Sequence, residues 1–243
     1  MRARKLGLAV MLALAGAAAG AIDIAQADAP SRTLVESLAA QAPALDRTVL
    51  ELALRAASCA ERSGQIRNPS ILTVIDYSLP STERRLWVLD LARRRLLHEE
   101  LVAHGRGTGE NIASRFSNEP GSRQSSLGLF VTRDTYLGRH GRSLRLEGLE
   151  RGVNDRALDR AVVIHAASYV SEEFAARHGR IGRSWGCPAL APEVASHVID
   201  TIRGGSAVFA YHPQRDWLRT SPFFTACGTS TARRTAAAPG RDS

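Results

Sequence analysis

Hydrophobic positions divide the chain into a helical region followed by a region of short strands. Between Ser31 and Arg62 apolar residues recur at helical spacing, and Pro43 separates two helices. The segments after that are rich in β-branched and aromatic residues, with Gly, Asn or Pro between them, and they predict strands at 71–77, 85–91, 96–102, 127–135, 143–147, 161–166 and 206–211. One late helix is predicted at 192–203, because Pro192 opens it and Gly204-Gly205 follows it.

This pattern predicts a mainly β fold. Many short strands with Gly turns favour a sandwich-like or barrel-like domain over a doubly wound parallel sheet. We expect a helical N-terminal extension over 28–69 and the main domain over 70–213. The remaining segment, 214–243, ends in Ala, Arg, Thr, Ser and Gly and is expected to be a largely disordered tail.

The first residues have the organisation of a signal peptide. Arg2, Arg4 and Lys5 precede an apolar run from Leu6 to Ala19, and Ala25-Gln26-Ala27 supplies small residues for cleavage. The alternative is an uncleaved membrane anchor, for which the run is short. We therefore expect a signal peptide over 1–27 and export to the periplasm or cell envelope.

Charge narrows the class of partner. The net charge is +8, from 32 Lys and Arg against 24 Asp and Glu, and Lys5 is the only lysine. The arginines are scattered rather than clustered with aromatic residues, so we expect no nucleic-acid partner. A basic surface suits an anionic polymer of the cell envelope. A genome that prefers arginine is the plainer explanation for the missing lysines.

The chain has three cysteines, Cys59, Cys187 and Cys227. In an oxidising compartment an odd count leaves one thiol unpaired. Cys59 lies in a helical stretch and Cys227 near the C-terminus, whereas Cys187 lies in a Gly/Pro turn. We hypothesise a Cys59–Cys227 disulfide; the alternative is two unreactive free thiols.

Cys187 and His165 form the strongest candidate for a catalytic pair. Cys187 lies between Gly186 and Pro188, a turn that can expose a thiol beside the backbone N–H groups of Gly186 and Cys187, which could hold an oxyanion. His165 ends an apolar strand, and histidine is the usual base for a cysteine nucleophile. Taken alone, His165 equally fits a structural histidine, but the cysteine turn favours catalysis.

Two motifs carry a resemblance to a known family. They are Val163-Ile164-His165-Ala166 and Gly182-Arg183-Ser184-Trp185-Gly186-Cys187-Pro188-Ala189, with further matching segments at 75–81, 85–90, 102–106, 116–118, 125–128 and 143–146. Over about residues 70 to 212 the sequence resembles the L,D-transpeptidase catalytic domain of the YkuD type, in its murein branch.

The resemblance implies a reaction and its participants. Cys187 would attack the carbonyl after the third residue of a peptidoglycan stem peptide, release the terminal D-alanine and form a thioester, which an amine from another stem or an envelope protein resolves. His165 would be the general base, Ser184 would hold the imidazole or line the pocket, and Arg183 would attract a stem carboxylate. Carbapenem-type inhibitors are expected to acylate the thiol. No cofactor is implied.

The sequence departs from the wider family at three positions. Trp185 stands where a histidine is usual, so His165 is the one base at the site and Trp185 excludes water or stacks on substrate. Ala189 stands where an arginine is usual, so Arg183 or Arg106 is expected to bind the carboxylate. Ala166 replaces a glycine after the strand histidine.

Two further residues are expected to border the cleft, His104 in a Gly-rich loop and Ser126. No metal site is expected, because the remaining histidines lack partners at ligand spacing. Two alternatives to transpeptidation stay open: a cysteine hydrolase acting on the cell wall as an L,D-carboxypeptidase or amidase, and an inactive wall-binding module.

Overall fold

The computed structural model describes residues 30–225 and 227. Eight strands form the sheet: β1 (Ile71–Asp76), β2 (Leu86–Asp90), β3 (Arg95–Glu100), β4 (Gly128–Gly138), β5 (Gly141–Gly148), β6 (Val163–Ala166), β7 (Ala189–Leu190) and β8 (Ala207–Tyr211). Six helices accompany them: α1 (Arg32–Gln41), α2 (Arg47–Arg62), α3 (Glu172–His178), α4 (Pro192–Ile202), α5 (Arg215–Thr220) and α6 (Pro222–Thr225).

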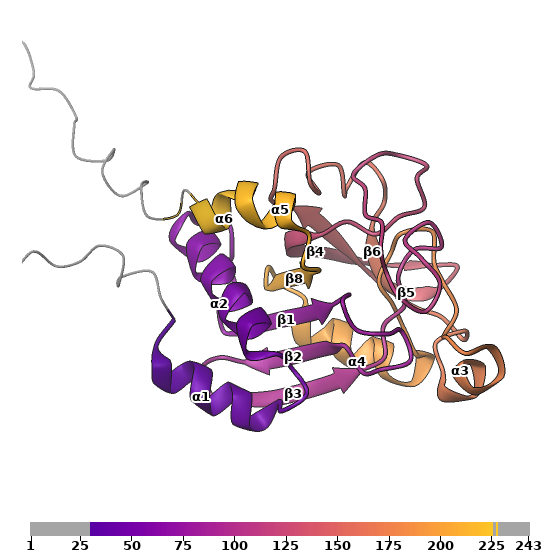
Figure 1. The fold of residues 1–243 in the computed structure, drawn as a ribbon, viewed down its shortest axis with the longest axis horizontal. Coiled ribbons are helices and arrows are strands. Elements are labelled where there is room, and N and C mark those ends of the chain that lie inside the picture. The colour runs from indigo at the N-terminus through magenta and orange to yellow at the C-terminus, as the bar shows by residue number, and fades with distance from the viewer. Residues whose placement is uncertain (1–29, 226, 228–243) are drawn as a thin grey trace, which may run out of the picture.

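The strands form one strongly twisted sheet in the order β3-β2-β1-β8-β4-β5-β6-β7 (Figure 1). Most neighbours are antiparallel, but β1 pairs with β8 in parallel and β6 pairs with β7 in parallel. The predicted mainly β, barrel-like architecture is confirmed. The short strand β7 was not predicted, because two residues carry no periodic signal.

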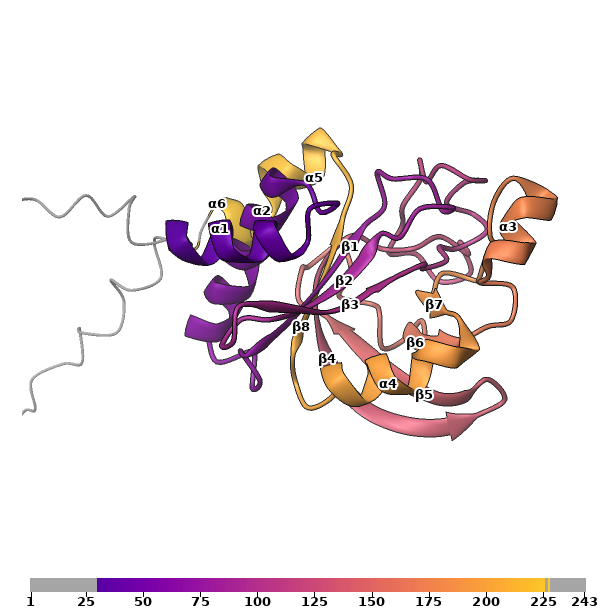
Figure 2. The same cartoon turned by 90° about the horizontal axis from the view of Figure 1, so that it is seen from below.

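Helices cover the sheet on two sides (Figure 2). On one side α2 packs on β1 and β8, and α1 and α6 pack beside it. Asp46 caps α2, its carboxylate accepting hydrogen bonds from the N–H groups of Thr48 and Val49, and the apolar face of the helix is buried. On the other side α4 packs against β1, β5 and β6. Both helical predictions, the N-terminal pair and the late helix, are confirmed; α3 was not predicted.

The C-terminal segment differs from the expected disordered tail. Residues 215–225 form α5 and α6, and Trp217 and Phe223 are buried. Trp217 Nε1 donates to Glu150 Oε2 at 2.9 Å, and Glu150 Oε1 accepts from the N–H of Leu129 in β4 at 2.7 Å. An indole that buries its apolar surface and also finds an acceptor is enough to order this segment. Most of 226–243 lies outside the described residues.

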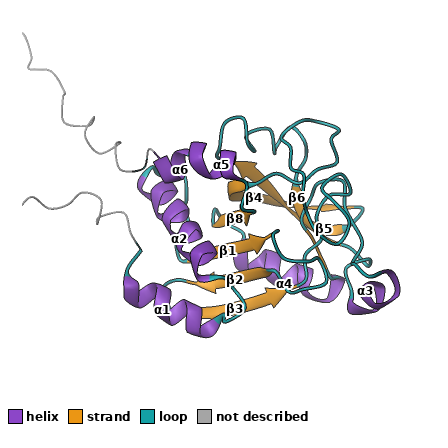
Figure 3. Ribbon diagram, viewed as in Figure 1, coloured by secondary structure: helices purple, strands orange, loops and turns teal. Residues whose placement is uncertain are grey.

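The predicted disulfide is present: Cys59 of α2 is bonded to Cys227, with their Cα atoms 5.7 Å apart. It joins α2 to Cys227, two residues after α6, and α6 itself lies beside α2 in Figure 3. The predicted signal peptide lies outside the described residues. Within 30–225, no helix is long and apolar enough to cross a membrane.

Candidate active site

Cys187 is the free thiol of the three cysteines and is partly exposed. Its Sγ accepts a hydrogen bond from the N–H of Val163 at 3.5 Å and donates to the carbonyl of Ala161 at 3.7 Å. These contacts hold the thiol against the start of β6. The same strand carries His165, so the fold brings the two predicted catalytic residues to one site although 22 positions separate His165 from Cys187 in the sequence.

His165 is oriented by its own strand. Its Nδ1 lies 2.9 Å from the carbonyl oxygen of Ala166. Because a carbonyl only accepts, Nδ1 carries the proton and Nε2 keeps its lone pair. The parallel pairing of β6 with β7 places His165 opposite Ala189, two residues after Cys187. This tautomer is the one a general base needs.

Among the described residues no hydrogen bond joins Cys187 Sγ to the His165 ring, because Sγ is occupied by the backbone of Val163 and Ala161. Catalytic hydrogen bonds are often longer in free enzymes and shorten when substrate binds. In this structure the thiol is thus held by backbone groups and not by the imidazole.

The surroundings of Cys187 and His165 favour the neutral form of both groups. Burial raises the pKa of the Cys187 thiol, against smaller lowering effects of the Val163 N–H and the Arg160 charge. Burial also lowers the pKa of His165, and the nearby His140 and Arg139 lower it further. Both pKa shifts favour a thiol and a neutral imidazole over a preformed ion pair. A neutral imidazole is the form that can accept the proton of a thiol.

Ser184 organises the cysteine turn. Its Oγ donates to the carbonyl of Cys187 at 2.6 Å and accepts from the N–H of Gly186 at 3.0 Å. The hydroxyl is therefore used within the turn, and Ala166 holds the imidazole instead. The expectation that Ser184 holds His165 is not met.

Gly186 is required by the backbone. Its φ is +128°, and a Cβ there would lie 2.8 Å from the carbonyl oxygen of Gln124. Its N–H is satisfied by Ser184, so in this geometry it is not a free oxyanion donor. The N–H of Cys187 has no acceptor in the described part of the chain. Of the two N–H groups predicted to hold an oxyanion, only that of Cys187 is therefore available in this geometry.

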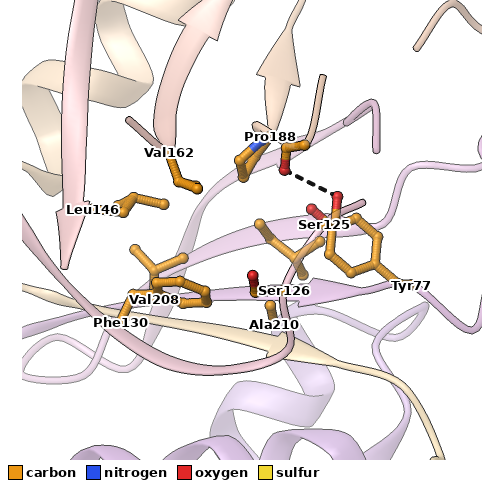
Figure 4. Close-up of a pocket in the computed structure, with 11 residues that line it drawn as sticks. Tyr77, Ser125, Ser126, Phe130, Leu146, Val162, Pro188, Val208 and Ala210 are labelled. Atoms are coloured by element: carbon orange, nitrogen blue, oxygen red, sulfur yellow. Dashed lines mark hydrogen bonds between the residues drawn. The ribbon is translucent and has the colours of Figure 1, made fainter. Parts of the chain in front are cut away.

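The loop that contains Ser125 supports the cysteine turn at Gly186. Ser125 Oγ accepts from the N–H of Gly105 at 3.0 Å and donates to the carbonyl of Gly186 at 3.1 Å (Figure 4). Behind this contact lies a small cavity whose lining is mostly apolar: Ile75, Tyr77, Ser125, Ser126, Phe130, Leu146, Val162, Gly186, Pro188, Val208 and Ala210. The back of the turn thus rests on the core, which keeps water from this hydrogen bond.

Two predicted substrate residues have structural partners. Arg183 Nη1 donates to Glu110 Oε1 at 2.6 Å and to the carbonyl of Gly109 at 2.9 Å, so its charge is already paired. His104 is fully buried, with Nδ1 2.7 Å from Arg85 Nη2, and burial lowers its pKa to about 4. Both side chains support the loop before Glu110 rather than face a substrate.

The other predicted contacts differ in accessibility. Trp185 is 67% exposed, and the guanidinium of Arg123 lies 5.1 Å from its ring centroid. Arg106 is exposed as well. Ser126 is buried, and its Oγ donates to the carbonyl of Ser117 at 2.9 Å. Trp185 and Arg106 therefore remain accessible to a substrate, and Ser126 does not.

Three residues at the site were missed from the sequence. The His140 ring, at the tip of the β4–β5 hairpin, lies 4.7 Å from the His165 ring between centroids. Arg160 precedes β6, and its charge interacts with Cys187. Tyr169 follows β6; burial and then the nearby Cys187 raise its pKa to about 12. Only their nearness to β6 in sequence hinted at Arg160 and Tyr169, and nothing hinted at His140.

Comparison with known proteins identifies the family. A family model described as the L,D-transpeptidase catalytic domain matches residues 41–211. The chain belongs to the L,D-transpeptidase catalytic domain family. The match begins before α2, so it includes the helix that packs on β1 and β8 as well as the sheet and both motifs.

Solved structures of L,D-transpeptidases are similar to this chain at low identity. An L,D-transpeptidase from Mycobacterium smegmatis is 15% identical over 59% of this chain and 59% of its own, with a TM-score of 0.37. An LD transpeptidase in complex with imipenem is 14% identical over 58% and 59%, with a TM-score of 0.38.

A third, L,D-transpeptidase 3 from Mycobacterium tuberculosis in complex with a faropenem-derived adduct, is 11% identical over 59% and 60%, with a TM-score of 0.38. The matches thus span less than two thirds of each of these three chains.

No curated protein sequence matches. Within the described residues, no three His, Cys, Asp or Glu side chains gather as a metal site would require.

Proposed function

We propose that this protein is an exported cysteine L,D-transpeptidase acting on peptidoglycan stem peptides. The observation that carries the proposal is a free, partly exposed Cys187 thiol held against the start of β6, the strand that carries His165, whose Nδ1 donates to the Ala166 carbonyl. Membership in the L,D-transpeptidase family gives this pair its reaction. The Cys59–Cys227 disulfide supports export, because such bonds persist in oxidising compartments.

In the first half-reaction, the Cys187 proton passes to His165 Nε2 as Sγ attacks the stem carbonyl carbon. The N–H of Cys187 donates to the oxyanion of the tetrahedral intermediate. The carbon–nitrogen bond to D-alanine then breaks, and His165 returns the proton to the departing amine. The product is a thioester on Sγ and free D-alanine.

In the second half-reaction an acceptor amine attacks the thioester carbonyl while His165 takes a proton from the amine. The carbon–sulfur bond breaks, a new amide bond forms, and the proton returns to Sγ. The acceptor is an amine of a second stem or of an envelope protein. A carbapenem carbonyl is an electrophile of the same kind, so we propose that it acylates Cys187.

The exposed surface beside the nucleophile supports a substrate contact at Trp185. An indole that is 67% exposed and stacked with the Arg123 guanidinium presents an apolar face and a positive charge together. We propose that Trp185 and Arg123, together with Arg106, contact the stem peptide. They would then bind the substrate in place of Arg183, which was expected to attract a stem carboxylate.

Incubation of the mature protein with disaccharide tetrapeptide, followed by mass spectrometry, tests the proposal. A cross-linked dimer together with free D-alanine is expected. Tripeptide without a dimer would show that water is the acceptor, as in a cysteine hydrolase. No product and no carbapenem adduct with folded wild-type protein would leave a wall-binding module and overturn the proposal.

A further inference from the structure

The guanidinium of Arg160 is held by four neutral oxygens of one loop. Its Nη1 donates to the carbonyl of Ser117 at 2.6 Å and to Ser126 Oγ at 2.5 Å. Its Nη2 donates to the carbonyl of Gln124 at 2.6 Å and to Ser122 Oγ at 3.4 Å. All four hydrogens on the two Nη atoms are thus directed at protein oxygens.

This guanidinium lies against the cysteine turn. A Cβ built on Gly186 would lie 3.4 Å from Arg160 Nη2 and 2.8 Å from the Gln124 carbonyl that Nη2 binds. The next residue, Ala161, supplies the carbonyl that accepts from Cys187 Sγ. Arg160 is therefore linked to Cys187 in two ways. Its guanidinium lies close to Gly186, which precedes Cys187, and its chain neighbour Ala161 accepts the hydrogen bond from the thiol.

The charge of Arg160 is not neutralised by a carboxylate. No ion pair involving Arg160 occurs within 30–225; Glu119 acts on its charge without a salt bridge, and its carboxylate is bound by Arg156 at 2.7 Å. Because its Nη hydrogens are already used, Arg160 is poorly placed to grip a substrate carboxylate with two parallel bonds. What it offers the site is a fixed positive charge in a partly buried place, where charges interact strongly.

We propose that Arg160 is a positioning residue that supplies the positive charge stabilising the Cys187 thiolate, while its four hydrogen bonds fix loop 117–126 against the turn. This inference rests on the proposed role of Cys187 as nucleophile. It is supported by the mutual effect of the two groups: Arg160 lowers the pKa of the thiol, and Cys187 raises that of Arg160. Burial opposes both charged forms.

The test is the rate at which iodoacetamide alkylates Cys187 as a function of pH, in the wild type, Arg160→Gln and Arg160→Lys. Removing an opposite charge near a thiol disfavours the thiolate, so we expect alkylation of the Gln variant to slow about tenfold below the thiol pKa. The Lys variant keeps the charge and should stay close to wild type although it loses most loop contacts. Equal losses in both variants, or an unchanged Gln variant, would overturn the proposal.

Arg156→Gln is the matched control. It removes another arginine that anchors the same loop, through its ion pair with Glu119, without a charge beside the thiol. Its alkylation profile should follow the wild type. Alkylation needs no peptidoglycan, so the outcome is independent of transfer activity: a wild type that alkylates as expected but makes no cross-link would refute the proposed function alone.

A second experiment tests the same charge without the Arg160→Gln variant, in case that variant does not fold. Lys5 is the only lysine of the sequence, so Arg160→Lys creates the single lysine of the chain after residue 27. Acetylation of that folded variant, with the thiol reversibly blocked and wild type treated in parallel, removes the charge in place. Alkylation should then slow about tenfold relative to the untreated variant, and an unchanged rate after confirmed acetylation would overturn the proposal.

Discussion

Two regions of the molecule are held together by different means. The helical flank, which we define as α1, α2, α5, α6 and the Cys59–Cys227 bond, packs on the sheet through buried apolar side chains. The catalytic edge, defined as β6, β7, loop 104–126 and turn 181–188, also buries apolar side chains such as Ile164 and Leu190, but its loop and turn are in addition fixed by hydrogen bonds to backbone groups. Ser184, Ser125 and Arg160 each bind at least two groups there.

The difference separates stability from reactivity. Apolar burial stabilises a fold without fixing the position of any one atom, whereas hydrogen bonds impose a distance and an angle. A thiol and an imidazole that must exchange a proton need the second kind of support. Variants of the flank should therefore change the free energy of unfolding, and variants of the edge should change the reaction.

The largest effect is expected for Cys187→Ala, which removes the proposed nucleophile. Transfer should fall to background and carbapenem should leave no adduct by intact-protein mass spectrometry, because no other described cysteine is free. The melting temperature should stay near that of the wild type, since the thiol makes only weak contacts at 3.5 and 3.7 Å. Turnover retained by this folded variant would remove Cys187 from the mechanism.

His165→Gln should lower kcat about 10²- to 10⁴-fold, the usual contribution of a general base. The wild-type kcat/KM should rise with pH through the His165 pKa, because the base works when unprotonated. Burial lowers this pKa, so the acid limb should lie below the ordinary histidine value of 6.5. At alkaline pH the thiol loses its proton, with a pKa that burial raises above the ordinary cysteine value. The rate should then fall again, so that the whole pH profile is bell-shaped. An acid limb that persists in the Gln variant would assign it to another group.

His140 offers a way to sharpen this assignment. Its ring lies 4.7 Å from the His165 ring between centroids, tilted by 36°, and it adds to the effect of burial in lowering the pKa of His165. His140→Phe keeps a ring in contact and removes the charge, so the acid limb should move to higher pH while the maximal rate changes little. Rates measured between pH 4 and pH 8 would show this, and an unmoved limb would mean that His140 does not act on His165.

The sequence predicted one region better than the other. Helical periodicity and strand patterning located α2, α4 and seven strands, since apolar burial leaves a periodic record in the chain. Cys187 and His165 were predicted as a pair because a turn and a strand end are visible in sequence, and the fold brings both to one site. The partners of Arg183, His104 and Ser184 were not, because a hydrogen bond to Glu110, Arg85 or the turn's own backbone depends on where distant loops meet.

The C-terminal segment shows the same limit for packing. Trp217 and the pair Phe223-Phe224 lie in a short and otherwise mostly polar stretch, which gives no period to read. Their burial depends on Glu150 and on α2, which lie far away in the chain. The disulfide was predictable only by elimination among three cysteines, and it extends the flank beyond the last helix.

Removing the disulfide tests the flank. Cys59→Ala with Cys227→Ala should lower the free energy of unfolding by about 2–5 kcal/mol, the usual cost of losing a native disulfide. Thermal or urea unfolding of the oxidised wild type and the double variant measures this. Transfer per folded molecule should be unchanged, because neither cysteine belongs to the edge. A large loss of activity in the folded double variant would contradict the separation of the two regions.

The smallest effect is expected at the exposed rim of the edge. Trp185→Leu removes the stacking surface beside Cys187 and should raise KM about tenfold with little change in kcat, since uniform binding is lost. Stability should hardly change, because the indole is 67% exposed. Arg123→Gln should give a change in the same direction, since its guanidinium stacks on that ring. The matched control is Leu158→Ala, another exposed apolar side chain, at 44% exposure and outside the cysteine turn, which should leave KM unaltered. A Trp185→Leu variant that lowers kcat instead of raising KM would show that the indole shields the reacting atoms from water rather than binding the stem peptide. Trp185 would then share the role of the hydrogen-bonded residues of the catalytic edge, which fix the reacting groups in place.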